Sequence, residues 1–337
     1  MAEGRKSTLV LVAEHAGVSI ATVSRVLNGL PAAQKTADAV RAAASELGYV
    51  PDATARSLKV GKTEQIALAV ADVGNPVYVA MMNQISQAVT DAGYRLVTSS
   101  TGNNPDDQIA LLDSLNRGYA DGVILSPLRV TESLIEALQA SRLPIVVIGS
   151  LPENVRIDSV RADSVAGMAL AVQHLADQGA KRIAFVNGPI DTVPGAARLR
   201  GYLAALDEQG MPTNADVQVS AEDFTFDAGL VAAQTLLDQA TPDAIVCAND
   251  LLAIATMKTL AKRGIRVPQD VLLIGMDDTE LAELSTPSIT SVNLGSVRRA
   301  KEAASLLIRR LKDPDAPIAR VVIDPTLTIR ESSVAPA

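Results

Sequence analysis

Several polar side chains stand where short apolar runs of the sequence end, and they are the residues best suited to bind a small molecule. The runs IALAVADV, RIAFVNG, DAIVCAND and VLLIGMDD each finish on, or are closely followed by, Asp or Asn. The residues concerned are Asp72, Asn75, Asn187, Asn249, Asp250, Asp277 and Asp278. Carboxylates and amides exchange hydrogen bonds with polar ligands, and ligands of α/β proteins bind beyond the carboxyl ends of strands. These residues therefore predict a binding site at the strand ends.

The sequence does not place a catalytic arrangement beside them. It has no GxGxxG after the first strand, no GxxxxGK[ST], no HExxH and no GxSxG. His15 and His174 lie far apart, and Cys247, the single cysteine, stands in the apolar run AIVC as expected of a buried thiol. Adjacent Asp277 and Asp278 point apart at a strand end, which favours binding by one and capping by the other over acid–base catalysis. We predict no catalytic residue, metal site or cofactor.

The elements that position the strand-end residues alternate along the chain from Glu64 onward. Nearly continuous apolar runs, typical of strands buried on both faces, alternate with helical stretches that often end in Gly. This alternation predicts an α/β body with parallel sheets and right-handed crossovers. The segments beginning IALAVADV and RIAFVNG each run strand, polar loop, long helix and Gly, which favours two doubly wound lobes that enclose one cleft.

The first 50 residues carry a different chemistry. The stretch VAEHAGVSIATVSRVLNGL, 12–30, predicts two short helices joined by a turn at Gly17, with Ser19 as the N-cap of a second helix over 20–27. The outward face of that helix carries Ile20, Ala21, Thr22, Ser24, Arg25 and Asn28. Hydroxyls, an amide and a guanidinium suit phosphates and base edges in a major groove. The pattern alone leaves a structural helical hairpin equally open.

Two further segments complete the N-terminal part. A third helix is expected over 36–47, with Gly48 after its end, and the segment DATARSLKVGKT, 52–63, predicts a helical turn too polar to bury itself. Such a segment orders when it meets a partner, the alternative being an ordinary helical linker.

Charge and hydropathy are distributed in agreement with this division. The 337-residue chain has a formal net charge of −8, yet residues 1–60 carry seven Lys or Arg against five acids. A mildly basic head on an acidic body fits a DNA-reading module attached to a body that does not bind DNA itself. No apolar run approaches the roughly 18 residues needed to span a bilayer, and MAEGRKST lacks the apolar core of a secretory signal. We expect a cytoplasmic protein with no membrane partner.

In order and at normal spacing, these segments resemble the lactose-repressor (LacI/GalR) family of bacterial transcription regulators. The resemblance rests on VAEHAGVSIATVSRVLNG, GYVP, ARSLKVGKT, GNPVY, GYADGVIL, RIAFVNGP, RLRGY, CAND, GMDD and LTIRESS. It implies an all-α helix-turn-helix head over 1–51, a hinge helix over 52–63, and a periplasmic-binding-protein-like body over 64–337. The implied first lobe spans about 64–162 and 291–322, and the second about 163–290 and 323–337.

The resemblance also implies partners and site residues. The partner is a pseudo-palindromic operator DNA bound by a homodimer. No leucine heptad follows Ser333, so we expect a dimer rather than a tetramer. In the recognition helix, Ile20, Ala21 and Arg25 match base-contacting positions. Positions matching phosphate contacts are Ser19, Thr22, Ser24, Asn28 and Tyr49. Ala55 and Leu58 match hinge residues that face the minor groove, where paired leucines wedge between base steps.

In the body, the resemblance implies an effector site formed by Arg198, Asp277, Asn249 and Phe224 on one lobe and by Val77 and Tyr78 on the other. A guanidinium and a carboxylate bind sugar hydroxyls, and an aromatic ring stacks on a sugar face. The chain departs from the family at Leu11, where an acid usually caps the first helix, at Ala33 and Ala37, and at Leu294, where a polar pocket residue is common.

The function expected is an effector-controlled transcriptional regulator, of the repressor type, that responds to a sugar or sugar derivative. The alternative within the family is a purine or nucleoside as effector. A pure solute-binding protein is less consistent with the basic head and the missing signal sequence. A dehydrogenase on an α/β scaffold is disfavoured because no dinucleotide fingerprint is present.

Overall fold

The computed structural model describes residues 8–50 and 61–334. The chain forms two compact units, Met1–Thr63 and Glu64–Ala337, which we call the head and the body and describe one at a time. The predicted hinge helix falls mainly on residues outside the described part of the chain, and Ala55 and Leu58 lie there too.

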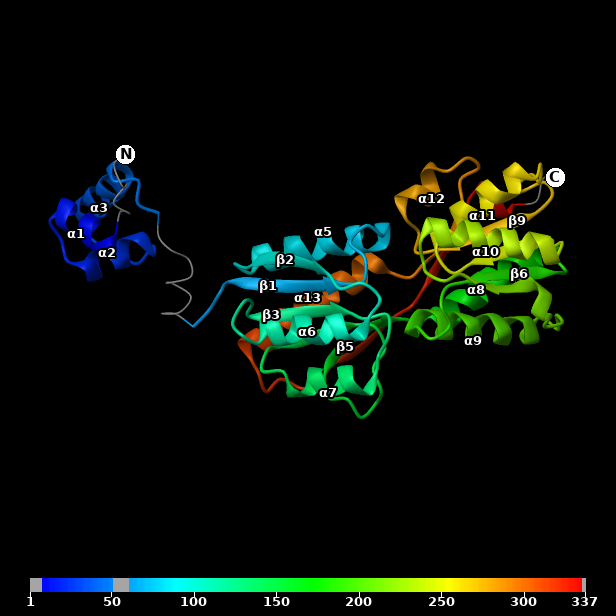
Figure 1. The fold of residues 1–337 in the computed structure, drawn as a ribbon, viewed down its shortest axis with the longest axis horizontal. Helices are drawn as coiled ribbons and strands as arrows, with labels where there is room; N and C mark the ends of the chain where they lie inside the picture. The colour runs from blue at the N-terminus through cyan, green and yellow to red at the C-terminus, as the bar shows by residue number, and fades with distance from the viewer. Residues whose placement is uncertain (1–7, 51–60, 335–337) are drawn as a thin grey trace. The chain divides into compact units, whose positions relative to one another are not determined.

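The head contains the helices α1 (Leu9–Ala16), α2 (Ile20–Leu27) and α3 (Gln34–Glu46) (Figure 1). Helix α1 begins upstream of the predicted stretch because the Thr8 hydroxyl accepts a hydrogen bond from the Leu11 N–H and caps it. Gly17, at φ 63°, ends α1 as predicted. Helix α3 begins two residues earlier than its predicted start and has no side-chain cap, because Ala33 occupies the N-cap position.

The core of the head consists of small side chains. Its buried members are Val12, Ala13, Val23, Val26, Ala37, Val40, Ala43 and Ala44. Leu9, Leu27, Leu47 and Tyr49 close it from the side and are only partly buried. Because so little apolar surface is removed from water, single caps contribute a large share of the stability of this unit.

Among the described residues, no single helix is long and apolar enough to cross a membrane. Helices α1 and α2 meet such a criterion only when taken together, by length and composition, across a bend of 103°.

The first lobe of the body is built on a six-stranded parallel sheet in the order β11-β5-β4-β3-β1-β2. The strands are β1 (Gln65–Val70), β2 (Arg95–Ser100), β3 (Gly122–Ser126), β4 (Ile145–Ile148), β5 (Asp158–Ala162) and β11 (Arg320–Ile323). Side chains of β1 alternate: Ile66, Leu68 and Val70 pack in one core, and Ala67 and Ala69 in another. Helices α5 (Pro76–Asp91) and α13 (Ser296–Lys312) supply the first core, and α6 (Pro105–Leu115) and α7 (Glu132–Ala140) the second.

The second lobe has its own six-stranded sheet in the order β12-β10-β9-β8-β6-β7, parallel except for β12, which pairs antiparallel with β10. Its strands are β6 (Ile183–Asn187), β7 (Gln218–Ser220), β8 (Ala244–Cys247), β9 (Leu272–Met276), β10 (Thr290–Asn293) and β12 (Thr326–Thr328). Helices α8 (Ser164–Asp177) and α9 (Val193–Glu208) cover one face, and α10 (Phe226–Gln239) and α11 (Asp250–Lys262) the other (Figure 1). The short helix α12 (Glu280–Leu284) follows β9. The prediction of two doubly wound lobes is confirmed.

The chain passes between the lobes three times. The first passage follows β5 and precedes α8. The second lies after Asn293. The predicted boundary at 290/291 is wrong, because β10 pairs with β9 of the second sheet. The third lies after Ile323 rather than at 322/323, because Ile323 still pairs with Ala162. All three passages lie at the carboxyl ends of β5, β10 and β11.

Candidate functional site

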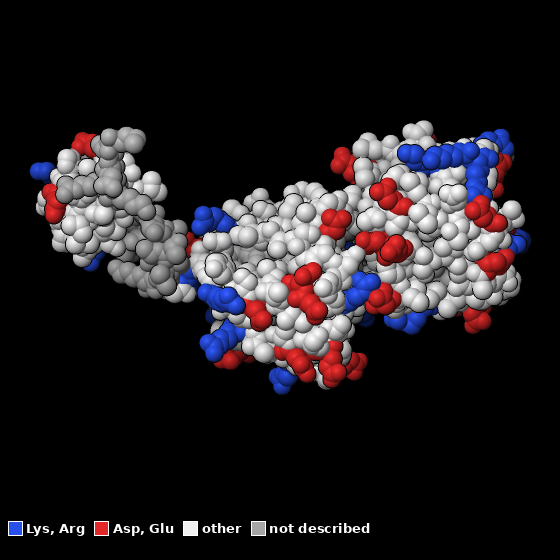
Figure 2. Space-filling view, viewed as in Figure 1, with Lys and Arg blue, Asp and Glu red and all other residues white. Residues whose placement is uncertain are grey.

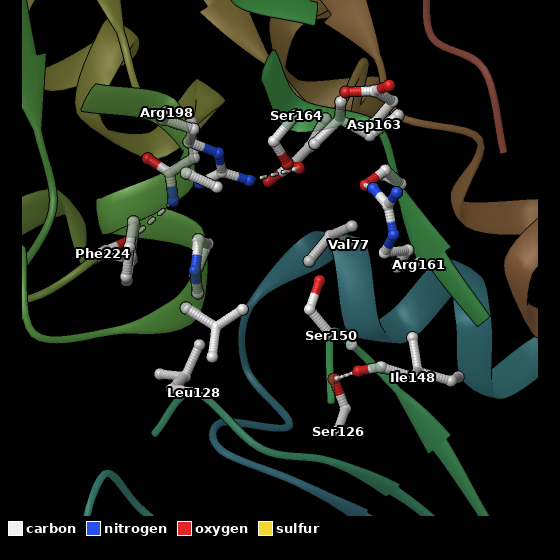
Figure 3. A pocket seen from close by; sticks show the side chains of 18 of the residues that line it. Val77, Ser126, Leu128, Ile148, Ser150, Arg161, Asp163, Ser164, Arg198 and Phe224 are labelled. Carbon is white, nitrogen blue, oxygen red and sulfur yellow. Dashed lines mark hydrogen bonds and ion pairs between the residues drawn. The ribbon is translucent and has the colours of Figure 1, made fainter. Parts of the chain in front are cut away.

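A cavity of about 920 Å³ lies between the two lobes, a volume in the range of small-molecule sites. Residues at the carboxyl ends of β1 to β5, together with Arg299 of α13, form one wall. Residues of α8 and α9 and those that follow β7, β8 and β9 form the other. Figure 3 shows Val77, Ser126, Ile148 and Ser150 of the first lobe facing Arg198 and Phe224 of the second. The ends of both sheets therefore form one site.

The structure brings together all six residues predicted for the effector site, since each of them lines this cavity: Val77, Tyr78, Arg198, Phe224, Asn249 and Asp277. Val77 and Tyr78 lie in the first turn of α5, which begins at Pro76 after the N-cap Asn75. The other four come from the second lobe. Leu294, where the family commonly has a polar residue, also lines the cavity and is buried.

The most polar part of the wall is the pair Arg198 and Asp277. The Arg198 Nη2 atom lies 3.7 Å from Asp277 Oδ1, and both side chains are only 8% exposed. Burial raises the pKa of Asp277, whereas the charges of Arg198 and Arg299 lower it. The guanidinium carbon of Arg198 also lies 5.6 Å from the centre of the Phe224 ring, within cation–π range. A donor, an acceptor and an aromatic face thus lie within one small region.

Asn249 has a structural part in the site. Its Nδ2 donates to the Phe224 carbonyl at 2.8 Å, and its Oδ1 accepts from the Leu252 N–H at 2.8 Å, which caps α11. The side chain therefore fixes the backbone that carries the Phe224 ring. One Nδ2 hydrogen and one Oδ1 lone pair are left for a ligand.

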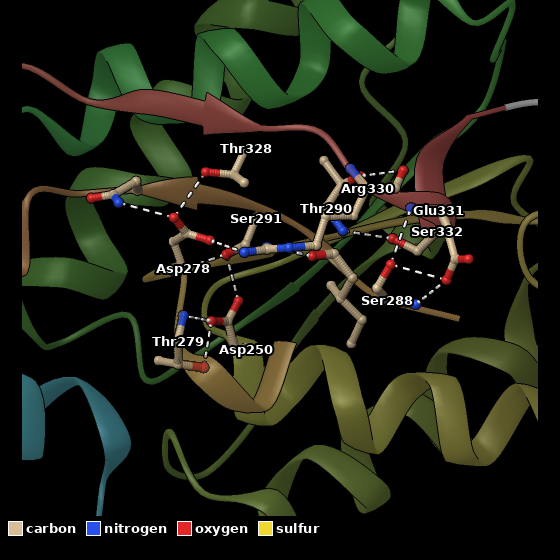
Figure 4. A network of polar contacts seen from close by, with 12 residues as sticks. Asp250, Asp278, Thr279, Ser288, Thr290, Ser291, Thr328, Arg330, Glu331 and Ser332 are labelled. Atoms are coloured by element: carbon tan, nitrogen blue, oxygen red, sulfur yellow. Dashed lines mark hydrogen bonds and ion pairs between the residues drawn. The ribbon is translucent and has the colours of Figure 1, made fainter. Parts of the chain in front are cut away.

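Three of the strand-end candidates do not line the cavity. The Asn187 amide donates to the Gly195 carbonyl and accepts from the Gly188 N–H. Asp278 accepts hydrogen bonds from Asn293, Thr328 and Arg330 at 2.7–2.9 Å (Figure 4). Its expected capping role is wrong, because Thr279 is the N-cap of α12 and Asp278 joins β10 and β12 instead. Asp277 and Asp278 do point apart.

Asp250, the third, supports the turn that carries Asp277. Its Oδ2 accepts from the Thr279 N–H at 2.7 Å and the Thr279 hydroxyl at 2.8 Å, and its Oδ1 accepts from the Ser291 hydroxyl at 2.6 Å (Figure 4). Asp277 and Asp278 have φ of 104° and 53°, so the turn is strained and needs such anchoring. Burial, and next the charge of Asp277, raise the pKa of Asp250 to about 7.

Arg299 is the lining residue that the sequence did not single out. It lies in the first turn of α13, next to exposed Arg298, and its Nε is buried without a hydrogen-bond partner. Two adjacent arginines on a helix read as a solvated face. Which of them enters a cavity depends on where the helix starts, and no pattern in the sequence gives that to within one residue.

The lobes also contact each other beside the cavity, through three contacts that we call the clasp. Arg129 Nε and Nη2 donate to the two Asp191 carboxylate oxygens at 2.8 and 3.0 Å. Asn103 Nδ2 donates to Asp223 Oδ2 at 2.9 Å, and the Val193 N–H donates to the Leu128 carbonyl at 2.7 Å. The sequence gives no signal for these pairs, since each joins residues of different lobes.

In the described part of the head, the predicted DNA-contacting residues lie on α2 and at its two ends, except Tyr49, which follows α3. Ser19 Oγ accepts from the Thr22 N–H at 3.2 Å and caps α2, which runs over the predicted residues. Ile20, Ala21, Arg25 and Asn28 are exposed, whereas Thr22, Ser24 and Tyr49 are half-buried. Arg25 makes no hydrogen bond or ion pair with the described residues, so its guanidinium is available.

Acidic side chains are prominent on the surface of the body. On the face of the body shown in Figure 2, Asp and Glu side chains lie on both lobes and gather near the junction between them.

Comparison with known proteins gives matches for both units. Residues 8–52 match the model described as "Bacterial regulatory proteins, lacI family", and residues 172–333 match the "Periplasmic binding protein-like domain". The HTH-type transcriptional regulator CelR of Thermobifida fusca is 36% identical over 342 residues, which cover 98% of this chain and 100% of CelR.

Two solved structures share the fold along almost the whole chain. A CelR–cellobiose complex is 34% identical, covers 97% of this chain and 99% of its own, and superposes with a TM-score of 0.74. A lac repressor dimer bound to operator and the anti-inducer ONPF superposes with a TM-score of 0.86, at 24% identity, over 98% of this chain and 100% of its own. The second likeness is one of fold alone.

Proposed function

The chain belongs to the lacI family of bacterial regulatory proteins, and from that premise we propose that its effector is a carbohydrate or carbohydrate derivative bound between the two lobes. As a family member it is a DNA-binding transcriptional regulator whose operator affinity an effector controls. The observation that carries the proposal is the buried pair of Arg198 and Asp277 beside the Phe224 ring, on the wall of a cavity of about 920 Å³.

The chemistry of this pair suits a polyol. A sugar hydroxyl both donates and accepts, so a guanidinium and a carboxylate a few ångströms apart satisfy neighbouring hydroxyls with charge-assisted hydrogen bonds. The Phe224 ring offers an apolar surface to the C–H face of a pyranose. The complex of the similar regulator CelR with cellobiose supports the same ligand class.

We further propose that α2 reads the operator, with Ile20, Ala21 and Arg25 toward the bases. The residues proposed to contact the DNA phosphates are Ser19, Thr22, Ser24, Asn28 and Tyr49. Exposure of Ile20 and the free guanidinium of Arg25 support this division. Ala55 and Leu58 belong to the proposal through the family resemblance, as residues that enter the minor groove from two copies of the chain.

The protein is proposed to act in the cytoplasm as a homodimer, without catalytic activity. The relative CelR is a regulator, and the lac repressor of similar fold binds operator as a dimer, which supports this reading.

A ligand panel followed by operator binding tests the function. Thermal unfolding of the full chain is measured with neutral mono- and disaccharides, including glucose, ribose and cellobiose, and with adenine, hypoxanthine, guanine and guanosine. A ligand in hundredfold excess over its Kd stabilises by about 2.7 kcal/mol, which shifts the melting temperature by several degrees. An operator is then selected from random duplex DNA, and its affinity is measured by fluorescence anisotropy with and without the ligand.

We expect a sugar or sugar derivative to shift the melting temperature and to change operator affinity. Asp277→Asn should lose both responses while operator affinity without ligand stays unchanged. If only a purine or nucleoside stabilised the chain, the effector would belong to that class, and the carbohydrate proposal would be wrong. Failure of the chain to select any duplex would contradict the DNA-binding assignment of α2.

A further inference from the structure

The Arg299 side chain is half-buried, and its guanidinium has no protein partner among the described residues. Arg299 lines the cavity, and no hydrogen bond or ion pair joins it to any other residue in the described part of the chain. Burial lowers its pKa, which means that the surroundings disfavour its charge, and the charge of Asp277 opposes that effect only in part. Because an arginine keeps its proton in proteins, Arg299 carries a positive charge with no carboxylate of the described residues at ion-pair distance.

Arg198 leaves a second guanidinium incompletely satisfied at the same place. Its Nε is buried without a hydrogen-bond partner, and its nearest carboxylate oxygen, on Asp277, lies at 3.7 Å, beyond hydrogen-bond distance. Burial lowers the pKa of Arg198 as well, and the charge of Asp277 opposes this. Two guanidiniums therefore share one carboxylate.

Three of the four other acidic residues that line the cavity accept hydrogen bonds from neighbouring groups, and the fourth is Glu208. Asp163 Oδ1 accepts from the Ala166 N–H at 3.0 Å and caps α8. Asp223 accepts from Asn103 Nδ2 and from the Phe224 N–H, and Asp72 accepts from the Gly74 N–H. Burial raises the pKa of Tyr78, so its phenol is uncharged at pH 7 and cannot serve as the anion. Taken by themselves, Arg198 and Arg299 with Asp277 thus carry one positive charge in excess.

We propose that the effector carries one anionic group, a carboxylate or a phosphate, and that Arg299 binds it while Arg198 and Asp277 bind hydroxyls. The proposal rests on the proposed carbohydrate function and narrows it to sugar acids or sugar phosphates. A guanidinium matches both groups because its parallel N–H bonds fit two oxygens of a carboxylate or phosphate.

The location of the two arginines gives this anion a mechanical role. Arg299 belongs to α13 of the first lobe, whereas Arg198 and Asp277 belong to the second. A ligand held by its anionic group on one lobe and by its hydroxyls on the other joins the lobes directly. A neutral sugar of the same size leaves Arg299 unpaired, so it gains less from the first lobe.

Matched ligand pairs test the proposal by calorimetric titration of the full chain. Glucose is compared with glucuronate and glucose 6-phosphate, and cellobiose with cellobionate, with inorganic phosphate and acetate as probes of the anion alone. We expect the anionic member to bind about 10- to 100-fold more tightly than its neutral partner, as for a charge-assisted hydrogen-bonded pair. The carboxylate and phosphate arms identify which group is preferred.

Arg299→Leu should abolish the preference and leave the Kd of the neutral sugar within about twofold. Arg298→Leu, an exposed neighbour on the same helix that loses the same charge, should keep the preference. Equal loss of neutral and anionic ligands in Arg299→Leu would show a structural role and overturn the proposal.

If neutral and anionic sugars bound the unaltered chain with equal affinity, the proposal of an anionic group on the effector would be wrong, and the proposed carbohydrate function would stand. Binding of purines alone, or of no sugar and no sugar acid at millimolar concentration, would overturn both proposals together.

Discussion

Three carboxyl groups at the ends of the neighbouring strands β8 and β9 have three different tasks, which shows how strongly the surroundings decide the chemistry of a residue. Asp277 faces the cavity, Asp278 joins β10 and β12, and Asp250 holds the turn between them through Thr279. Only Asp250 combines near-complete burial with a set of three neutral donors. Burial outweighs these hydrogen bonds and raises its pKa to about 7, so its titration falls near neutral pH.

We predict that Asp250 makes the body less stable as the pH rises. Its folded-state pKa of about 7 exceeds the ordinary value of 3.8, so the folded protein holds a proton that the unfolded chain releases. The contribution is fully present below the unfolded value and is lost as the pH rises through about 7, with an upper limit of roughly 4 kcal/mol. Urea unfolding between pH 4.5 and 8 measures this decline, which should be smaller in Asp250→Asn.

The matched control for that experiment is Asp270→Asn. Asp270 is exposed, and its hydrogen bonds with Arg266 lower its pKa to about 2, so its titration lies below the window. The control should keep the slope of the unaltered chain. An Asp250→Asn slope equal to that of the unaltered chain would show that Asp250 stays ionised in the folded state.

At the scale of elements, the head shows how a short helix depends on its ends. Helices α1 and α2 are capped by Thr8 and Ser19, whereas α3 begins after Ala33, whose methyl group accepts no hydrogen bond. The N–H groups in the first turn of α3 have no carbonyl partner within the helix, and a hydroxyl at position 33 would supply a partner to one of them. In so small a unit this omission is a measurable part of the stability.

We expect Ala33→Ser to stabilise the head by about 0.5–2 kcal/mol, because a serine hydroxyl accepts the Thr36 N–H. The measurement is hydrogen exchange of the α3 amides in the full chain, which should slow about 2- to 30-fold when exchange requires unfolding of the head. Ala32→Ser, one residue earlier and equally exposed, is the control and should leave these rates unchanged. Identical rates in the two variants would rule out a capping role for position 33.

The second prediction at this scale concerns the reading face of α2. Arg25→Ala should weaken operator binding by about 1–3 kcal/mol and relax the preference at one base pair of each half-site, since a guanidinium contacts a guanine edge. Anisotropy titrations on the selected operator and on single-base variants measure both effects. Arg41→Ala on α3 removes the same charge from an exposed site and should leave the base preference intact. A uniform loss on all sequences would place Arg25 on a phosphate.

At the scale of the whole body, the clasp links two lobes that otherwise meet around a cavity. Arg129 binds both oxygens of Asp191, and Arg129 Nη1 also donates to the Asn103 carbonyl, whose side chain reaches Asp223. The Arg129 side chain is 24% exposed and that of Asp191 64%, so water screens the pair and its net contribution is small. The clasp therefore biases the spacing of the lobes without locking it.

We predict that Arg129→Ala raises the effector Kd about two- to fivefold, because a ligand that contacts both lobes must then hold them together without the clasp. Calorimetric titration with the effector measures the change. Arg117→Ala, an exposed arginine of the same lobe, removes the same charge and should leave the Kd unchanged. Tighter effector binding in Arg129→Ala would mean that the clasp favours the ligand-free spacing instead.

The sequence predicts the layers of this molecule better than its contacts. Apolar runs such as AIVC and VLLIG identify buried strands, and Gly17 and Ser19 identify helix ends, because these signals are local. Asp277 was predicted from its place at a strand end, Arg198 through the family resemblance, and the fold brings both to one wall. Arg299 and the Arg129–Asp191 pair were missed because their partners depend on which residues face each other across two lobes. The crossing after Asn293 was misplaced because β10 has the same apolar pattern in either sheet.

The late arrival of strand β11 has a consequence for synthesis on the ribosome. Strand β5 ends at Ala162, but its outer neighbour begins only at Arg320, after every other strand of both sheets except β12 has been translated. Until then β5 is an open edge on a sheet that has otherwise emerged, and open edges invite pairing between nascent chains. A message truncated shortly before codon 320 would therefore yield a product prone to aggregation, with the second lobe nearly complete and the first lobe unsealed.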